Sequence, residues 1–447
     1  MRYHIYYKLF LLLSLQNLII SYIKLPIFTY HSPYPNKTTE LAYVKYFSEN
    51  NIYTYLNIGN PSQKIVAKLN FNDYSFYMYY NKCEIFSYFN INESNSYTIT
   101  PNGYLLTDVY VYTYLVNDSF FFSENEKNNP YNLTYLFSPM NKDSYEMKLQ
   151  KLPYTCAQIG LKLSYSELKS YNYNFIIELK KLELIENYTI FIEYNEKNEE
   201  EGNIVFGAEA YKYSKKYKYS QLKEIYSVLT HDLYWQIKFD LINFKILDKN
   251  QTNYTYYNLS DTEAGLDHNL NVILATYEYY EFIEKSFFKQ KIKDNLCKMN
   301  RLENNYYNYE CSNFEDIKEF PTLYFFHRNL EYTFELNYTD LFTEYEGKYI
   351  SLIWIDMSYR KYWKLGKPFL KKYFFTFNLE KKIIGFYDPS IKAQENDKSN
   401  KLNYVYIPII IILIIIMGVI GYFLAKAIYK NKINRRKKAD ELIDEIN

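Results

Sequence analysis

The chain has almost no charge imbalance and few cysteines, and each shortage argues against a class of partner. It has 52 Lys+Arg against 51 Asp+Glu, a net charge of +1. Balanced charge gives no electrostatic reason to expect nucleic acid or another polyanion. The four cysteines form no Cys-x-x-Cys pair and no cluster with histidine, so their spacing indicates no zinc site. We therefore expect no nucleic acid, no metal and no cofactor.

Short motifs of several common enzyme classes are also missing. No Gly-x-Ser-x-Gly, His-Glu-x-x-His, P-loop or Gly-x-Gly-x-x-Gly sequence occurs. Glycine is scarce, with 11 residues, whereas the chain has 57 Tyr and 31 Phe. Aromatic side chains suit pleated, half-buried surfaces, so most of these tyrosines are expected to be ordinary strand residues.

Both ends of the chain are apolar. Residues 1–22 combine early positive charge with an apolar stretch from Leu9 to Ile20, which predicts a secretory signal peptide, with a non-cleaved anchor as the alternative. At ~1.5 Å per residue, apolar residues 404–426 are long enough to span a ~30 Å hydrocarbon core as one transmembrane helix. Basic residues in 427–447 predict a cytoplasmic tail. The sequence thus predicts a single-pass type I protein of the cell surface or of a secretory or endolysosomal membrane, in contact with the lipid bilayer.

Nine Asn-x-Ser/Thr sequons precede the predicted membrane span and agree with that topology. An Asn-rich chain also forms sequons by chance. The predicted glycosylation positions are Asn36, Asn92, Asn117, Asn132, Asn187, Asn250, Asn253, Asn258 and Asn337.

From about Asn51 to Pro389 the chain consists of short apolar runs, many alternating with polar residues and bounded by turn residues. This pattern predicts strands and hairpins. Helical patches interrupt it near 164–184 and 276–292, so we expect a mostly β protein with minor helix. We interpret the segment before Thr38 as a loose lead-in. The predicted divisions are an N-terminal β lobe at 40–215, a C-terminal β lobe at 216–390 and a stalk at 391–403.

Five segments, in the correct order, resemble the pepsin-like aspartic peptidases over roughly residues 50–390. The resemblance implies a bilobal, pepsin-like acid protease fold. The matching segments are 55–70 (the first hairpin), 201–213 (the end of the first lobe), 234–244 (the strand that opens the second lobe), 297–327 (its disulfide loop) and 363–389 (the closing segment).

The chemistry of that family needs one aspartate from each lobe, because two close carboxylates share one proton and activate a water between them. The first triplet of this chain begins with Asn70. The eleven-residue spacing from Gly59, the aromatic Tyr77 and the cysteine Cys83 all support this register. Placing Asp73 there instead would break all three spacings. An amide therefore replaces the first catalytic carboxylate.

The second triplet retains Asp267. His268 follows it, where the family has a small hydroxyl residue, and an extended segment would point its ring away from Asp267. We interpret His268 as packed or solvated; a role as replacement base is the alternative. Phe71 and His268 displace the paired hydroxyls that brace the two family loops. Asn72 and Asn269 replace glycines, and Asn tolerates left-handed backbone best among other residues.

The resemblance also suggests roles outside the triplets. Tyr97 is the best match to the family's flap tyrosine. Cys297 and Cys311 match its second-lobe disulfide, which closes a loop of ~15 residues and contributes about 3 kcal/mol by chain-entropy estimates. Cys83 and Cys156 either pair with each other or remain two free thiols.

Three functional hypotheses follow. The favoured one is a pepsin-fold ectodomain that has lost proteolysis and binds an extended peptide or protein ligand in the inter-lobe cleft. The second is an active, membrane-bound aspartic endopeptidase that uses Asp267. The third is a glycosylated surface or adhesion scaffold.

Overall fold

The structure is a computed structural model of the chain, which divides into two units, Met1–Pro389 and Ser390–Asn447. The residues that it describes are 22–29, 47–73, 75–79, 89–106, 112–122, 130–138, 157–162, 174–195, 197–198, 200–228, 235–247, 254–302, 305–358, 361–391 and 421–429.

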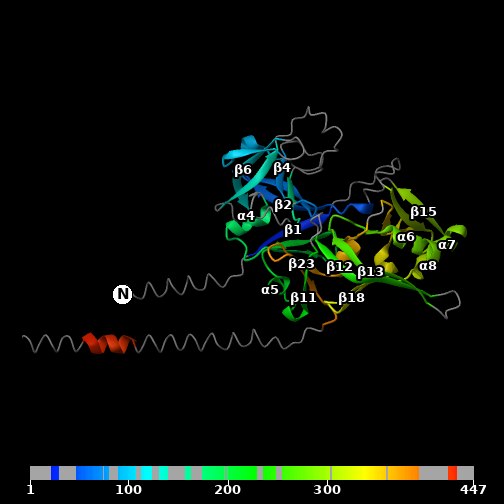
Figure 1. Cartoon of the computed structure of the whole chain (residues 1–447). Helices are drawn as coiled ribbons and strands as arrows, with labels where there is room; N and C mark the ends of the chain where they lie inside the picture. Colours follow the sequence, from blue (N-terminus) through cyan, green and yellow to red (C-terminus); the bar gives the residue numbers. More distant parts are fainter. Residues whose placement is uncertain are drawn as a thin grey trace, which may run out of the picture. The chain divides into compact units, whose positions relative to one another are not determined.

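The described strands of the first unit form two sheets, so the predicted mostly β class is confirmed (Figure 1). The 13-stranded sheet has the spatial order β11 (Leu222–Tyr226), β24 (Ile383–Tyr387), β23 (Phe375–Asn378), β9 (Thr189–Tyr194), β10 (Glu201–Phe206), β1 (Ile23–Thr29), β2 (Ile52–Ile58), β3 (Gln63–Asn70), β8 (Ala157–Gly160), β4 (Phe76–Tyr79), β7 (Tyr131–Ser138), β6 (Tyr112–Phe121) and β5 (Thr98–Leu106).

The 11-stranded sheet contains the second candidate loop. Its order is β18 (Tyr332–Leu336), β17 (Leu323–His327), β12 (Gln236–Leu247), β13 (Tyr254–Leu266), β22 (Trp363–Leu365), β14 (Ile273–Ala275), β21 (Ile353–Asp356), β16 (Tyr306–Cys311), β20 (Lys348–Ser351) and β19 (Phe342–Tyr345), with β15 (Cys297–Leu302) paired to β16.

Short helices accompany the sheets. The predicted helical patch near 276–292 is confirmed, because α6, η4 and α7 run through it in succession. Of the patch near 164–184, residues 164–173 lie outside the described residues, and α4 lies in the rest. The side chain of Asn174 caps α4 by accepting the N–H groups of Ile176 and Ile177. In the described residues, the helices that accompany the sheets are η1 (Ile91–Glu93), α4 (Phe175–Lys181), α5 (Ala210–Tyr213), η3 (Tyr219–Gln221), α6 (Tyr277–Ile283), the π-helix η4 (Glu284–Phe288), α7 (Lys289–Lys293), α8 (Phe314–Lys318), α9 (Tyr338–Leu341) and α10 (Lys367–Lys372).

Strand β1 corrects one expectation. The segment before Thr38 was predicted to be a loose lead-in, but Ile23–Thr29 is an internal strand, antiparallel to both β10 and β2. Leu25 and Ile27 alternate with Lys24 and Pro26 and are only 3% exposed. Period-two burial of this kind fixes a strand in its register. The interpretation as a lead-in is therefore wrong for these seven residues.

The last strands of the first unit return to the 13-stranded sheet. Strand β23 pairs with β9, and β24 pairs with both β23 and β11. Residues on both sides of the predicted lobe boundary at 215/216 therefore share one sheet. The boundary itself stays a prediction.

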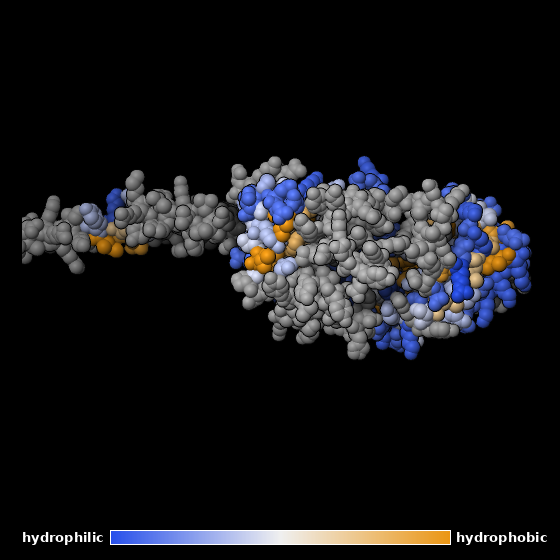
Figure 2. Space-filling view, turned by 90° about the horizontal axis from the view of Figure 1, so that it is seen from above, coloured by the Kyte–Doolittle hydropathy of each residue, from blue (hydrophilic) through white to orange (hydrophobic). Residues whose placement is uncertain are grey.

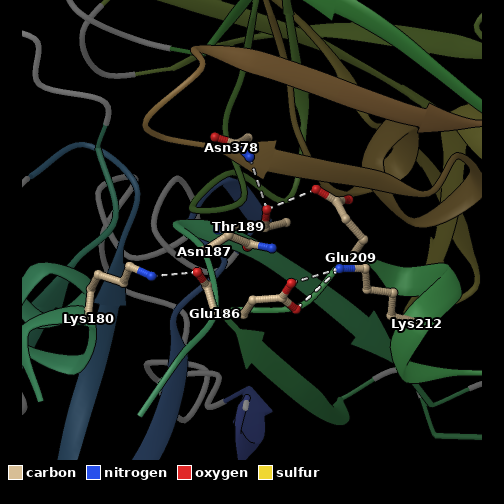
Figure 3. Close-up of polar contacts among 7 residues, drawn as sticks. All are labelled: Lys180, Glu186, Asn187, Thr189, Glu209, Lys212 and Asn378. Atoms are coloured by element: carbon tan, nitrogen blue, oxygen red, sulfur yellow. Dashed lines mark hydrogen bonds and ion pairs between the residues drawn. The ribbon is translucent and has the colours of Figure 1, made fainter. Parts of the chain in front are cut away.

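A buried polar cluster ties this return to its neighbours (Figure 3). The Thr189 hydroxyl accepts from Asn378 Nδ2 at 3.2 Å and donates to Glu209 Oε1 at 2.9 Å. Burial raises the pKa of Glu209, and the bond from Thr189 opposes that rise. At the edge of the cluster, Lys212 forms an ion pair with Glu186 at 3.1 Å. One hydroxyl thus joins β9, β23 and the start of α5.

The described surface of the first unit is mostly hydrophilic in the view of Figure 2, with small apolar patches. Within the described part of the chain, no helix is long and apolar enough to cross a membrane. Residues 421–429 are helical. The predicted signal peptide up to residue 21, the stalk from residue 392 and residues 404–420 of the predicted span lie outside the described residues.

Candidate functional site

Two loops meet where β3 and β13 end. Strand β3 ends at Asn70 and pairs in parallel with β8, which places Gly160 beside Asn70. Strand β13 ends at Leu266 and pairs in parallel with β22, which places Leu365 beside Leu266. Asp267 follows directly. The two loops therefore leave similar pairs of parallel strands, one in each sheet.

The internal geometry of the two loops is also the same. The Asn72 N–H donates to Asn70 Oδ1 at 2.9 Å, and the Asn269 N–H donates to Asp267 Oδ1 at 2.9 Å. Each contact closes an Asx turn, in which a side-chain oxygen accepts a hydrogen bond from the backbone N–H two residues further along the chain. Asn70, rather than Asp73, is thus the structural counterpart of Asp267.

Asp73 has a different environment. Its Oδ1 accepts the Ser75 N–H at 3.0 Å, and its Oδ2 accepts Gln158 Nε2 at 2.7 Å. Gln158 also accepts from Asn70 Nδ2 at 3.1 Å, so it bridges the two residues. The sequence analysis did not predict a role for Gln158, because its partner Asn70 lies 88 residues away along the chain.

Asn72 reaches across to the other loop. Its Nδ2 donates to Asp267 Oδ2 at 3.2 Å. Asn72 is exposed, whereas Asp267 is only 3% exposed. Both oxygens of Asp267 accept a hydrogen bond, one from the backbone of its own loop and one from Asn72. The amide therefore covers the retained carboxylate on its solvent side.

Asn269 makes the return contact. In one orientation its Nδ2 donates to Asn70 Oδ1 at 3.0 Å. In the other, Nδ2 donates to the Leu69 carbonyl and Oδ1 accepts the Phe71 N–H, both at 3.1 Å. We favour the second orientation. In the first, the side-chain oxygen of Asn269 faces the carbonyl oxygen of Leu69, and neither atom carries a proton to share. In the second, Oδ1 of Asn269 lies near Oδ1 of Asn70. Either way, amides span the two loops where the family uses hydroxyls.

Burial controls the titration of Asp267. It raises the pKa of this carboxyl, and four groups oppose the rise: the Asn269 N–H, the positive charge of Lys364, the Asn72 amide and the charge of Lys68. Asn70 carries no titratable proton. The site therefore holds one covered carboxylate where a catalytic pair would share a proton.

His268 is part of the packing. Its ring lies 4.5 Å from that of Phe71 and 5.9 Å from that of Phe377, centroid to centroid, and its Nδ1 lies 3.2 Å from the Tyr194 hydroxyl. Burial lowers the pKa of His268 to about 3, so the ring is neutral. Its Nε2 is buried and has no hydrogen-bond partner among the described residues. These contacts fit a packed histidine.

Tyr97 lies immediately before β5, at the start of the β5–β6 hairpin. Its ring packs edge-on against Phe137 at 5.8 Å. Burial, followed by the nearby Asp118 charge, raises the pKa of Tyr97. The turn of this hairpin, residues 107–111, lies outside the described residues. A flap role for Tyr97 stays a prediction.

The buried acid Asp118 lies near Tyr97, and the sequence analysis did not predict its role. Asp118 is fully buried and accepts from Ser94 at 3.0 Å, from Ser96 at 2.5 Å and from the Ser119 N–H at 2.7 Å. Burial raises the pKa of Asp118, and these bonds oppose the rise. The arrangement anchors the loop that precedes β5.

The disulfide between Cys297 and Cys311 is confirmed; these residues face each other across β15 and β16. Cys83 and Cys156 lie outside the described residues. Within the described chain, no group of three or more His, Cys, Asp or Glu side chains could hold a metal ion.

The sequons differ in accessibility, and their glycosylation stays a prediction. Asn117 accepts from the Thr134 hydroxyl at 2.7 Å, Asn187 from the Thr189 N–H at 2.9 Å and Asn337 from the Thr339 N–H at 2.9 Å. Asn92, Asn132 and Asn258 are exposed, and Asn36, Asn250 and Asn253 lie outside the described residues.

Comparison with known proteins places this site in a family. A family model described as eukaryotic aspartyl protease matches residues 153–388, a range that includes Asp267 but not Asn70. Two curated relatives, both named plasmepsin IV and from two isolates of Plasmodium falciparum, are 31% and 30% identical over 164 residues. Each match covers 36% of this chain and 31% of the relative, so the similarity spans about a third of either protein.

Proposed function

The chain belongs to the eukaryotic aspartyl protease family, and from this we propose that it is a member without proteolytic activity that binds an extended peptide over its two central loops. The observation that carries the proposal is the pairing of Asn70 with a covered Asp267. Asn72 Nδ2 donates to Asp267 Oδ2 at 3.2 Å, so this oxygen of the retained carboxylate already has a hydrogen-bond donor.

The chemical reason is the loss of the shared proton. Hydrolysis by a carboxylate pair needs one ionised group to take a proton from water and one protonated group to polarise the carbonyl. An amide at Asn70 does neither. Each oxygen of Asp267 already accepts a hydrogen bond. Asp267 alone can therefore provide at most one of these two functions.

Peptide binding does not depend on the missing carboxylate. Extended peptides bind through backbone hydrogen bonds, and amide side chains both donate and accept them. Asn72 is exposed and Asn70 is partly exposed, so this surface offers such groups to solvent.

The proposal includes membrane anchoring. The supporting features are the apolar residues 404–426, the basic tail after them and the apolar residues near the N-terminus. Together they favour a type I protein whose first unit lies outside the cytosol, at the cell surface or in a secretory or endolysosomal membrane.

Peptide capture tests the proposal. The full chain, purified in detergent and immobilised, is incubated with a degenerate peptide pool, and bound and free peptides are identified by mass spectrometry. Asn72→Trp places a bulky ring on the proposed surface, and Gln290→Trp makes a matched change on α7.

We expect intact peptides on the wild type and on Gln290→Trp, and at least tenfold fewer on Asn72→Trp. Equal capture by Asn72→Trp, or no capture by any form, would contradict the proposal. Cleaved peptides would support the endopeptidase alternative.

A further inference from the structure

We propose that strand β11 is an interaction surface: its free edge adds the edge strand of a partner protein, with a Lys or Arg side chain of the partner opposite Glu224. This surface contains no residue of the two central loops, so the inference goes beyond the proposed function. In strand addition, main-chain hydrogen bonds provide affinity and alternate side chains provide specificity.

Strand β11 ends the 13-stranded sheet, and among the described residues β24 is the strand that pairs with it. The Ser227 N–H donates to the Lys382 carbonyl at 2.9 Å, on the β24 side. Backbone groups alternate in direction along an antiparallel strand, so those of Leu222, Glu224 and Tyr226 point away from β24.

Most of these outward groups are open in the described part of the chain. The Leu222 N–H donates to the Tyr219 carbonyl in the turn that precedes the strand. The carbonyl of Leu222 and both backbone groups of Glu224 and Tyr226 have no hydrogen-bond partner among the described residues. An open edge of this kind is a template for a further strand.

Glu224 gives the open edge a negative centre. Its side chain is exposed, and Gly385, its cross-strand neighbour on β24, has no side chain to pair with it. Within the described chain, its carboxylate takes part in no ion pair and no hydrogen bond. Opposite charges that face each other across two strands stabilise the pairing, whereas like charges destabilise it. A basic residue is therefore the complement at this position.

Exposed tyrosines accompany the acid. Tyr226 lies two residues after Glu224 on the same face of β11 and is 78% exposed. Tyr219, just before the strand, is 66% exposed, and its ring packs edge-on against that of Tyr211 at 5.1 Å. Tyrosine is enriched among the residues that contribute most to protein–protein binding. The edge thus combines open backbone groups with aromatic side chains that a partner can cover.

Strand β18, at an end of the other sheet, shows the contrast. Its Glu335 is also exposed, but the Glu335 N–H donates to the Tyr373 hydroxyl at 2.6 Å, and this hydroxyl donates to the Glu335 carbonyl at 2.9 Å. One side chain therefore closes that edge. No side chain in the described residues does the same for Glu224.

The charge of Glu224 decides between occupants. A second copy is disfavoured, because symmetric antiparallel pairing of two β11 strands would place Glu224 opposite Glu224. A flexible peptide would lose backbone entropy on ordering, which a preformed strand has already lost. The complementary occupant is therefore the edge strand of a folded protein with a basic residue at its centre.

A hairpin probe tests the inference. A disulfide-closed β-hairpin presents the strand Val-Thr-Lys-Thr-Val with the backbone groups of both valines and the lysine outward. Its binding to the full chain in detergent is measured by calorimetry. We expect the same hairpin with Glu in place of Lys to bind at least about tenfold more weakly. N-methylation of the lysine backbone removes an outward donor and leaves the bonds within the hairpin intact, and it should abolish binding.

Matched variants identify the strand. Glu224→Lys should reverse the preference, so that the glutamate hairpin binds more tightly than the lysine hairpin. Glu335→Lys makes the same change on the closed edge, and Asn72→Trp alters the proposed peptide surface; both should keep the wild-type preference.

Three results would overturn the inference: no binding of either hairpin, equal binding of both to the wild type, or full binding of the N-methylated form. An unchanged preference in Glu224→Lys would do so as well. The N-methylation experiment uses the wild type, so it decides the matter even if Glu224→Lys does not fold.

Discussion

The side-chain amide of Asn72 donates to Oδ2 of Asp267 across 3.2 Å, from one central loop to the other. Asn72 stands at the third position of its triplet, where the family has glycine, so a side chain fills space that a peptidase leaves open. The retained aspartate is therefore separated from solvent by a residue of the opposite loop. Asp267 is only 3% exposed.

Restoring a carboxylate at position 70 is expected to be insufficient for proteolysis. Asn70→Asp alone leaves the Asn72 amide over Asp267, so no measurable peptide cleavage should appear. Asn70→Asp combined with Asn72→Gly uncovers the carboxylate and should produce cleavage at acidic pH. A fluorogenic peptide pool assayed from pH 3 to 7 checks this. Cleavage by Asn70→Asp alone would show that Asn72 is no obstacle.

The free energy of unfolding should depend on pH because the charge of Asp267 is buried. Because its folded-state pKa is raised, its contribution to stability is fully present below its unfolded pKa of about 3.9 and is lost as pH rises through the folded-state pKa. Asp267→Asn never ionises. We expect this variant to match the wild type near pH 3 and to be more stable at pH 7, measured by denaturant unfolding. The same substitution at Asp261, whose side chain is 72% exposed and pairs with Lys238, removes a surface carboxylate and serves as the control. A variant equally or less stable at pH 7 would contradict the prediction.

His268 should behave as a packing residue with the opposite pH dependence. Its pKa is lowered from 6.5 to about 3, so the wild type loses stability as pH falls through that window. His268→Phe keeps the ring against Phe71 and should gain on the order of 3 kcal/mol relative to wild type between pH 8 and pH 4. His268→Ala removes the ring and should cost about 3 kcal/mol at pH 8. Unfolding curves at both pH values measure each effect; a pH-independent difference for His268→Phe would show that the ring is already protonated or exposed.

The hydroxyl of Thr189 should stabilise the chain through its two partners (Figure 3). Thr189→Val leaves Asn378 and Glu209 without it and should cost about 2 kcal/mol in unfolding free energy. The change also removes the sequon of Asn187. Thr189→Ser keeps both the hydroxyl and the sequon and is the matched control. If valine and serine variants unfold alike after enzymatic deglycosylation, the hydroxyl contributes nothing.

Sequence reasoning located the site where local spacing was sufficient. The distance from the turn at Gly59 to the strand end fixed Asn70, and the structure gives Asn70 the same turn geometry as Asp267. Gly59 has φ +89°, a conformation that favours glycine, which makes it a dependable landmark. The resemblance to the family likewise predicted the bond between Cys297 and Cys311.

Contacts between segments far apart in the sequence could not be predicted from local patterns. Strand β1 was missed because its partner β10 lies far along the chain, at Glu201–Phe206, and only that pairing distinguishes it from a lead-in. Two contacts between the loops were likewise not predicted: Asn72 reaches Asp267, and the amide of Asn269 contacts the backbone of the first loop. No local pattern reveals that a side chain two residues beyond a strand reaches the opposite loop.

The most direct measurement is peptide cleavage by the purified full chain, from pH 3 to 7, with Asp267→Ala assayed in parallel. We expect no cleavage above that control at any pH, because Asn70 cannot share a proton and Asn72 covers Asp267. Cleavage that disappears in Asp267→Ala would contradict the central claim and would identify the chain as an aspartic endopeptidase that works with one carboxylate from these two loops.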